Sequence, residues 1–234
     1  IPKNECAIGI SDGSVQDIAI ISKVNKPICF RVTGFENKNN ETMVTLSRKI
    51  VQEECLDNYI KNLNTGDIID AKITHLEQFG CFVDIGCGIT SLIPIDSISI
   101  SRILHTKDRF KVGQEIKCIV KSKEKDGKIC LTHKELLGNW EQNASKYKSG
   151  ETVAGIIRSI EDYGIFVELS PNLAGLAEYK DGVKVGQMAS VYIKSLIPEK
   201  MKVKLIIVDS FDENYVDYNY NYFIKDSHID YWKY

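Results

Sequence analysis

An internal repeat is the feature that most limits what this 234-residue chain can fold into. The segment Gly66–Ile73 aligns with Gly150–Ile157 at an offset of 84 residues. Further along, Phe110–Ser122 aligns with Val183–Ser195 at an offset of 73, so the later copy lacks 11 residues between the two blocks. Such a repeat indicates one small supersecondary unit that is used more than once. We call residues 66–134 the second unit and residues 150–210 the third unit.

Residues 1–49, the first unit, match only the back half of the repeat. Ser22–Val32 aligns with the block that begins at Phe110, and Met43–Lys49 aligns with Lys128–Lys134. Nothing in the first unit corresponds to residues 66–92. The first unit is therefore expected to be a partial repeat that lacks its first strands, and the chain is expected to begin inside a repeat.

Each full unit is expected to form five short β-strands. Runs of β-branched and aromatic residues are bounded by turn pairs such as Asp126-Gly127 and Pro171-Asn172. The intervening segments, 50–65 and 135–149, have the composition of helices and are predicted to be linker helices, although Gly138 weakens the second. The predicted fold class is all-β, with tandem barrels joined by these short helices.

The second predicted strand of each full unit has two aromatic residues, one just before the strand and one within it. The motif is LEQFGCFVDI in the second unit and IEDYGIFVEL in the third. Because strand side chains alternate between faces, Phe82 and Phe166 are expected on the solvated face, beside a carboxylate. The Gly before each strand permits a bulge that would bring Phe79 and Tyr163 to the same side. Such rings are a platform on which unpaired bases can stack. The alternative is that they pack under a loop or against a neighbouring barrel.

This combination of motifs resembles the S1 RNA-binding domain family. The shared features are the opening Gly, the (F/Y)-G-x-F-V-(D/E) segment, the later VGQ and the closing K-I-C-L or K-V-K-L. The resemblance covers residues 66–136 and 150–210 fully and 1–49 in part, in the manner of bacterial ribosomal protein S1-like proteins with tandem repeats. It implies five-stranded barrels of the OB-fold, and binding of single-stranded RNA on strands two and three and the nearby loops.

Some family positions are occupied differently here. The family often has a His in strand three, where this chain has Pro94 and Glu178, with Pro2 in the first unit. A basic residue often opens strand five, and Lys128 and Lys202 match it. These departures predict that the units bind RNA unequally.

Charge favours the second unit as the stronger RNA site. Residues 66–134 hold 11 basic and 9 acidic residues, whereas residues 150–210 hold 7 and 8. Beside Phe79 and Phe82, we expect phosphate contacts from a basic hairpin and the segment before it, although charge runs are often only solvated surface. The candidate RNA-binding residues, besides the four aromatic residues, are Arg102, Lys121, Lys123, Lys125 and Lys128 of the second unit, and Arg158 and Lys202 of the third.

Bulk properties exclude several other classes. The formal charge of −2 argues against a strongly basic, non-specific nucleic-acid binder. No apolar run is long enough for a transmembrane helix. The seven Cys form no CxxC pair, which favours a reducing cytoplasm, and the four His are not placed with them at metal-ligand spacing. The sequence lacks the common catalytic motifs. We therefore expect no enzyme activity, no metal, no small-molecule cofactor and no membrane partner.

The C-terminal tail, residues 211–234, is both aromatic and acidic. It holds six Tyr, two Phe and one Trp, with a net charge of −3. We expect it to pack on the third unit, and contact with a partner protein is the functional alternative. The packing residues are expected to be Phe223, Ile224, Ile229 and Trp232.

Three functional hypotheses remain at this point. The first is binding of single-stranded RNA, either mRNA or ribosomal RNA, in translation or RNA metabolism. The second is a protein-interaction module that docks on the ribosome, a ribosomal protein or an RNA-processing partner. The third is an RNA-binding appendage of a larger enzyme.

Overall fold

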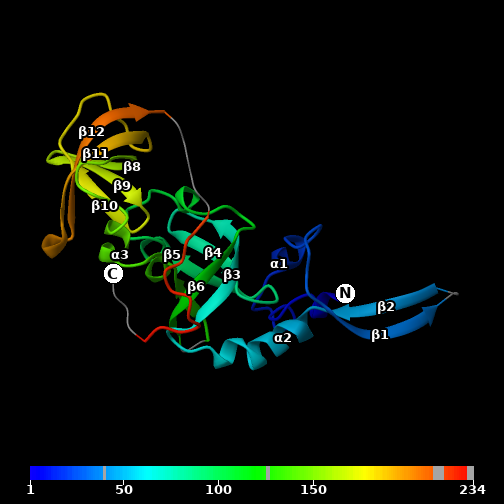
Figure 1. Ribbon diagram of the computed structural model, residues 1–234. Coiled ribbons are helices and arrows are strands. Elements are labelled where there is room, and N and C mark those ends of the chain that lie inside the picture. The colour runs from blue at the N-terminus through cyan, green and yellow to red at the C-terminus, as the bar shows by residue number, and fades with distance from the viewer. Residues whose placement is uncertain (39–40, 125–126, 213–218, 231–234) are drawn as a thin grey trace.

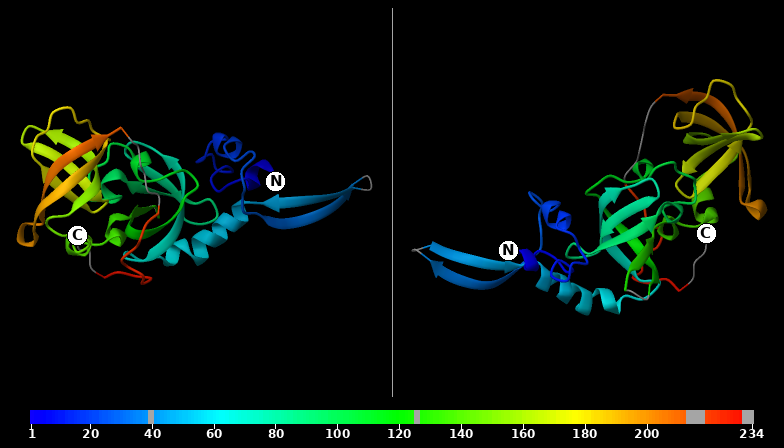
Figure 2. Two further views of the ribbon diagram at one scale, coloured as in Figure 1. Left: turned by 45° about the horizontal axis from the view of Figure 1, so that its top comes forward. Right: turned by 180° about the vertical axis from the view of Figure 1, so that it is seen from behind.

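The computed structural model contains two closed five-stranded β-barrels, and it describes residues 1–38, 41–124, 127–212 and 219–230. The barrels lie side by side in all views (Figures 1 and 2). In the second unit the strands follow one another around the barrel in the order β3-β4-β5-β7-β6. Their bounds are β3 Ile68–Leu76, β4 Gly80–Asp84, β5 Thr90–Pro94, β6 Glu115–Lys123 and β7 Ile129–Thr132.

The third unit has the same topology, in the circular order β10-β12-β11-β8-β9. In both units the third and fifth strands pair in parallel, and the other described pairings are antiparallel. This is the five-stranded barrel of the OB-fold, so the predicted fold class is confirmed. The bounds are β8 Thr152–Glu161, β9 Gly164–Ser170, β10 Leu173–Ala177, β11 Met188–Ile197 and β12 Lys202–Phe211.

Each barrel encloses its own apolar core. Alternate residues of β4 point inward, so that Cys81 and Val83 are fully buried, and Ile165 and Val167 repeat this in β9. Cys81 and Cys118 act as small, neutral core residues. Their thiols stay protonated because burial raises the pKa of Cys81 to about 12 and raises the pKa of Cys118 well above its usual value. These cores make each barrel a rigid support for its outer face.

The first unit forms a two-stranded antiparallel hairpin with short helical segments. Strands β1 (Arg31–Lys38) and β2 (Glu41–Ser47) follow the 3₁₀ turn Lys3–Glu5 and helix α1 (Ile18–Ile21). The hairpin extends away from both barrels (Figure 2). On this hairpin the side chain of Phe35 is 72% exposed. Within the described residues, no barrel closes around these two strands.

The connections between units are helical but short. Helix α2 (Lys49–Asn58) and the 3₁₀ turn Ile60–Asn62 lead into the second unit. After it, a 3₁₀ turn at Lys134–Leu137 and helix α3 (Trp140–Ala144) are separated by Gly138, whose φ of 81° interrupts the helix. No helix in the described part of the chain is both long and apolar enough to cross a membrane.

Residues 219–230 of the tail pack on the second unit and on the linker that follows it, and not on the third unit. The amide of Phe223 donates to the carbonyl of Leu136 at 2.9 Å, and the amide of Ile229 donates to that of Gly66 at 3.0 Å. The hydroxyl of Tyr222 donates to His133 or accepts from it at 3.3 Å. The expectation that Phe223, Ile224 and Ile229 cover the third unit is therefore wrong, because the tail returns to the preceding barrel. Trp232 lies outside the described residues.

Candidate nucleic-acid interface

The second strand of each barrel presents a pair of aromatic rings. Phe79 and Phe82 lie with ring centroids 6.1 Å apart in an edge-to-face arrangement, and Tyr163 and Phe166 do the same at 6.1 Å. The first ring of each pair is the more exposed, at 59% for Phe79 and 71% for Tyr163. Phe82 and Phe166 are half-buried. Both barrels thus carry an aromatic platform of the same geometry at the equivalent place.

A glycine lies between the two rings of each pair, and the neighbouring strand approaches it too closely for a side chain. A Cβ on Gly80 would lie 2.5 Å from the carbonyl oxygen of Ile93, and a Cβ on Gly164 would lie 2.5 Å from that of Ala177. The bulge expected at these glycines lies instead on the partner strand. Its extra residues are Thr74 in β3 and Arg158 in β8, opposite the half-buried ring.

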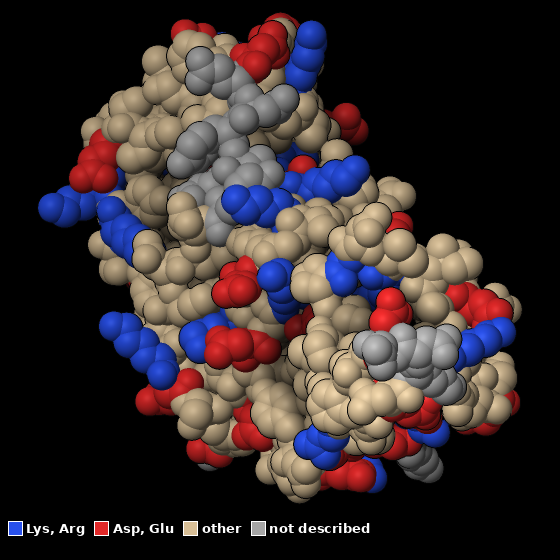
Figure 3. Space-filling model, turned by 90° about the vertical axis from the view of Figure 1, so that its right-hand side faces the viewer, with Lys and Arg blue, Asp and Glu red and all other residues tan. Residues whose placement is uncertain are grey.

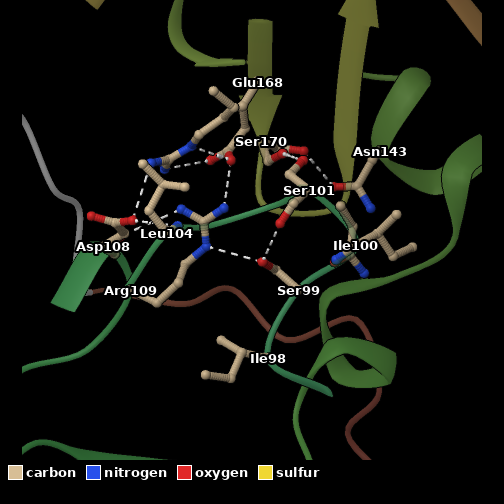
Figure 4. A network of polar contacts seen from close by, with 12 residues as sticks. Ile98, Ser99, Ile100, Ser101, Leu104, Asp108, Arg109, Asn143, Glu168 and Ser170 are labelled. Atoms are coloured by element: carbon tan, nitrogen blue, oxygen red, sulfur yellow. Dashed lines mark hydrogen bonds and ion pairs between the residues drawn. The ribbon is translucent and has the colours of Figure 1, made fainter. Parts of the chain in front are cut away.

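The bulge directs Arg158 towards the other barrel. Its Nε lies 2.8 Å from Oε2 of Glu168, and its side chain is only 10% exposed. Arg109, from the second unit, contacts the same carboxylate at 2.5 Å, and both of those side chains are 5% exposed. Asp108, whose side chain is 34% exposed, lies 3.8 Å from Arg158 and completes an ionic network between the barrels (Figure 4).

Two expectations change because of this network. Glu168 shares the outer face of β9 with Phe166, as strand alternation predicts, but Arg109 covers it and the face is not solvated there. Arg158, a predicted RNA contact, has its guanidinium committed to Glu168. Its placement therefore favours a role in joining the barrels over a role in binding phosphate.

The basic residues of the second unit are mostly engaged with their own barrel. The ammonium of Lys121 donates to the hydroxyl of Ser97 at 3.0 Å. Lys123 donates to the carbonyls of Lys61 and Leu63 at 2.6 and 3.0 Å, which attaches the linker to the barrel. Lys128 lies directly before β7 and is exposed, and Lys125 lies outside the described residues.

The third unit has a basic hollow beside its rings. A cavity of about 590 Å³ is lined by Tyr163 and Phe166 and by three lysines. Lys194 lies 3.6 Å from Glu178, whereas Lys202 and Lys204 have no acidic partner among the described residues. The predicted residue Lys202 is thus brought to the predicted rings. The local charge beside these rings is thus basic, although the unit as a whole has 7 basic and 8 acidic residues.

Lys194 and Lys204 were missed by the sequence reasoning, although the repeat contains a signal for the first of them. Lys194 aligns with Lys121 at the offset of 73, and both occupy the fourth strand of their barrel. Lys204 aligns with Cys130, which is apolar in character, so only the third unit has a cation there. Unit-wide net charge does not detect such a local exchange.

Arg102 of the second unit lies at the rings of the third. It lines a second cavity, of about 520 Å³, together with Tyr163 and Phe166. Its side chain is exposed, and no acidic partner is found for it in the described part of the chain. Sequence position assigned Arg102 to the Phe79 platform, but folding places it beside the other platform.

Basic and acidic side chains alternate over the face of the molecule shown in Figure 3, without a large area of one sign. Among the described residues, no group of three or more His, Cys, Asp and Glu side chains is arranged to hold a metal ion. The chemistry available at the rings is stacking on aromatic faces and pairing of lysine or arginine with an anion.

Comparison with known proteins finds a family that matches the second unit. Residues 62–134 match the family described as S1 RNA binding domain. The second unit is similar to S1 domains. The resemblance read from the repeat motifs is confirmed for this segment.

The segment that matches the S1 family lies within a longer region of similarity. The chain is 28% identical over 215 residues to the small ribosomal subunit protein bS1 of Staphylococcus aureus (strain COL), which covers 85% of this chain and 54% of the relative. It is 30% identical over 215 residues to bS1 of Staphylococcus haemolyticus (strain JCSC1435), covering 87% and 52%. The chain thus spans about half the length of these relatives.

Among solved structures, the chain is similar to a multidomain protein with nucleic acid binding domains from Streptococcus pneumoniae. The sequence identity is 15% and the TM-score is 0.30, with 63% of this chain and 54% of that chain covered.

Proposed function

We propose that this chain binds single-stranded RNA on the aromatic faces of its two barrels and acts in translation, in contact with mRNA or ribosomal RNA. It acts by binding and not by catalysis, in the cytoplasm. The observation that carries the proposal is the pair of edge-to-face rings repeated at the equivalent strand of both barrels. The S1 domain match and the similarity to ribosomal proteins bS1 support it.

The barrel of the third unit is proposed as the stronger of the two sites. Tyr163 and Phe166 offer faces on which bases can stack, and such stacking contributes about 1–3 kcal/mol per base. Lys202 and Lys204 lie beside them without acidic partners among the described residues, and can pair with the phosphates that connect those bases. This arrangement recognises a flexible strand whose bases are unpaired, because a duplex keeps its base faces stacked on each other.

A titration with a fluorescently labelled oligouridylate at fixed salt tests the proposal. Phe166→Ala is expected to weaken binding by about 5- to 100-fold, since it removes one stacking face. Tyr192→Ala is the matched control, because Tyr192 is an exposed aromatic residue of the same barrel that does not line the hollow. Equal affinities of the wild type, Phe166→Ala and Phe82→Ala would contradict the assignment of the RNA-binding face.

Three features suggested a protein-interaction module: the near-neutral charge, the absent His in strand three and the acidic aromatic tail. The aromatic tail was a candidate surface for a partner, but Tyr220 and Tyr222 are half-buried against the second unit. Phe223 is likewise covered, with the ammonium of Lys146 4.6 Å from its ring centroid. These three aromatic side chains of the tail are thus engaged within the chain.

A further inference from the structure

The junction between the two barrels contains a hollow that neither barrel forms alone. Its volume is about 520 Å³, within the range of about 300–1,000 Å³ that is typical of ligand pockets. Ile100, Ser101 and Arg102 line it from the second unit, and Arg158, Tyr163 and Phe166 line it from the third. A ligand in this hollow would contact both barrels at once.

The junction hollow adjoins the hollow on the face of the third unit. Tyr163, Phe166 and Met201 line both of them. A base stacked on Phe166 therefore lies at the boundary between the two. The nucleotide that follows it along the strand has two directions to take, one past Lys202 and Lys204 and the other into the junction towards Arg102.

Arg102 is the cation of the junction hollow that is available to a ligand. Arg158 also lines the hollow, but Glu168 holds its guanidinium at 2.8 and 3.3 Å. Glu161 also lines the hollow, but no ion pair joins it to Arg102 in the described part of the chain. Arginine presents several N–H donors in a plane, which suits the two free oxygens of a phosphodiester.

The polypeptide around Arg102 is held in place by bonds across the junction. The amide of Ser101 donates to the carbonyl of Pro171 at 3.0 Å, and the amide of Ile100 donates to the side-chain oxygen of Asn172 at 3.1 Å. The Arg109–Glu168 pair lies a few residues further along the same loop (Figure 4). Since the backbone of this loop is already held, binding at Arg102 has to order only the arginine side chain.

We propose that the junction hollow is a second RNA subsite, in which Arg102 of the second unit binds the phosphate of the nucleotide next to the base stacked on Tyr163 and Phe166. This subsite rests on the proposed function, because it extends the same bound strand. It makes the two barrels one composite binding surface, whose path for RNA crosses from the third unit to the second.

The test compares affinities for an oligouridylate of about 20 nucleotides, longer than the roughly 4–16 nucleotides that one barrel binds. Arg102→Gln is expected to weaken binding by about 10-fold, as removal of one charge-assisted contact does. Lys107→Gln is the matched control, an exposed cation of the same loop that does not line the hollow. Circular dichroism of each variant establishes that it is folded, which is expected because Arg102 is exposed.

The outcomes separate the two proposals. If Phe166→Ala weakens binding and Arg102→Gln does not, RNA binds the rings but the junction subsite is wrong. If Arg102→Gln and Lys107→Gln weaken binding equally, the effect is general electrostatic attraction and the subsite is also wrong. If neither Phe166→Ala nor Arg102→Gln has an effect, the proposed RNA-binding face fails as well.

Discussion

At the scale of single residues, one repeat position shows how the two barrels differ. In the second unit Asp84 accepts hydrogen bonds from the amides of Gly86 and Gly88 at 2.9 and 3.0 Å and ends the strand. In the third unit the equivalent Glu168 is one methylene longer and reaches Arg109 and Arg158. The same acidic position thus stabilises a turn in one barrel and joins two barrels in the other.

Strand alternation was sufficient to predict the rings but not the partners of the charged residues. Phe82 and Phe166 lie on the outer face because their neighbours Val83 and Val167 fill the cores. Arg158 was predicted to be an RNA contact of the third unit. Its actual direction is set by the bulge in β8, by Glu168 of β9 and by Asp108, which lies 50 positions earlier in the chain, and the contact with Asp108 does not follow from a local pattern.

A prediction at this scale concerns His133, which is completely buried. Burial lowers its pKa from 6.5 to about 4, because the charged imidazolium is disfavoured away from water. The unfolded chain therefore binds a proton at a higher pH than the folded chain does. The free energy of unfolding is expected to be unaffected by this group above pH 6.5 and to fall by about 3 kcal/mol as the pH drops towards 4.

Urea unfolding at several pH values, followed by fluorescence, measures this loss. In His133→Gln the group cannot titrate, so the decline between pH 6.5 and 4 should be smaller than in the wild type, even if the variant is less stable at neutral pH. Identical pH profiles for the two proteins would show that His133 is not the residue responsible.

At the scale of elements, the 11 residues that the third unit lacks between its two aligned blocks correspond to a loop of the second unit that contacts the other barrel. The extra length lies between β5 and β6, where residues 95–110 form two 3₁₀ turns and a loop. This loop supplies Ile100, Ser101 and Arg109 to the junction. The repeat alignment revealed the length difference, but only the fold shows that the insertion faces the next barrel.

The tail is the element that sequence reasoning placed wrongly. Its apolar residues predicted that it covers a barrel, and proximity in sequence favoured the third unit. The second unit offers better partners, because the amide of Lys117 donates to the Tyr222 hydroxyl at 3.1 Å and Ile68 donates to the carbonyl of Ser227 at 2.8 Å. Backbone groups available for pairing at β3 and β6 are not visible in a hydropathy pattern.

Tyr222→Phe tests the attachment of the tail. Removing the hydroxyl leaves His133 and the amide of Lys117 without the partner that they now share, at a cost of about 1–3 kcal/mol in unfolding free energy. Tyr179→Phe is the control, because Tyr179 is 63% exposed and lies on the third unit. Equal urea midpoints for the two variants would contradict the described packing of the tail.

At the scale of the whole molecule, RNA binding is proposed to depend on a few local cations and not on overall charge. The chain carries 30 basic and 32 acidic residues, so long-range attraction for a polyanion is weak. Arg102, Lys202 and Lys204 gather around one pair of rings. Sequence composition could predict the weak overall field, but the meeting of cations from two barrels depends on the tertiary structure.

The salt dependence of binding follows from the number of cations at the rings, which is three: Arg102, Lys202 and Lys204. Each phosphate contact to a single strand contributes a slope of about −0.7 in a plot of log affinity against log salt, so three contacts predict a slope of about −2. Lys202→Gln is expected to make the slope less steep by about 0.7. Lys184→Gln, at an exposed lysine away from the hollows, should leave it unchanged. A slope near zero for the wild type would contradict phosphate pairing.

The most direct test of the RNA-binding face is photo-crosslinking of a 4-thiouridine oligonucleotide to the intact chain, with the attached residues mapped by mass spectrometry. Because bases are proposed to stack on the exposed rings, the account predicts adducts at Tyr163 and Phe166, and weaker ones at Phe79 and Phe82. Adducts confined to the hairpin of β1 and β2 or to the C-terminal tail, with none at these rings, would contradict it.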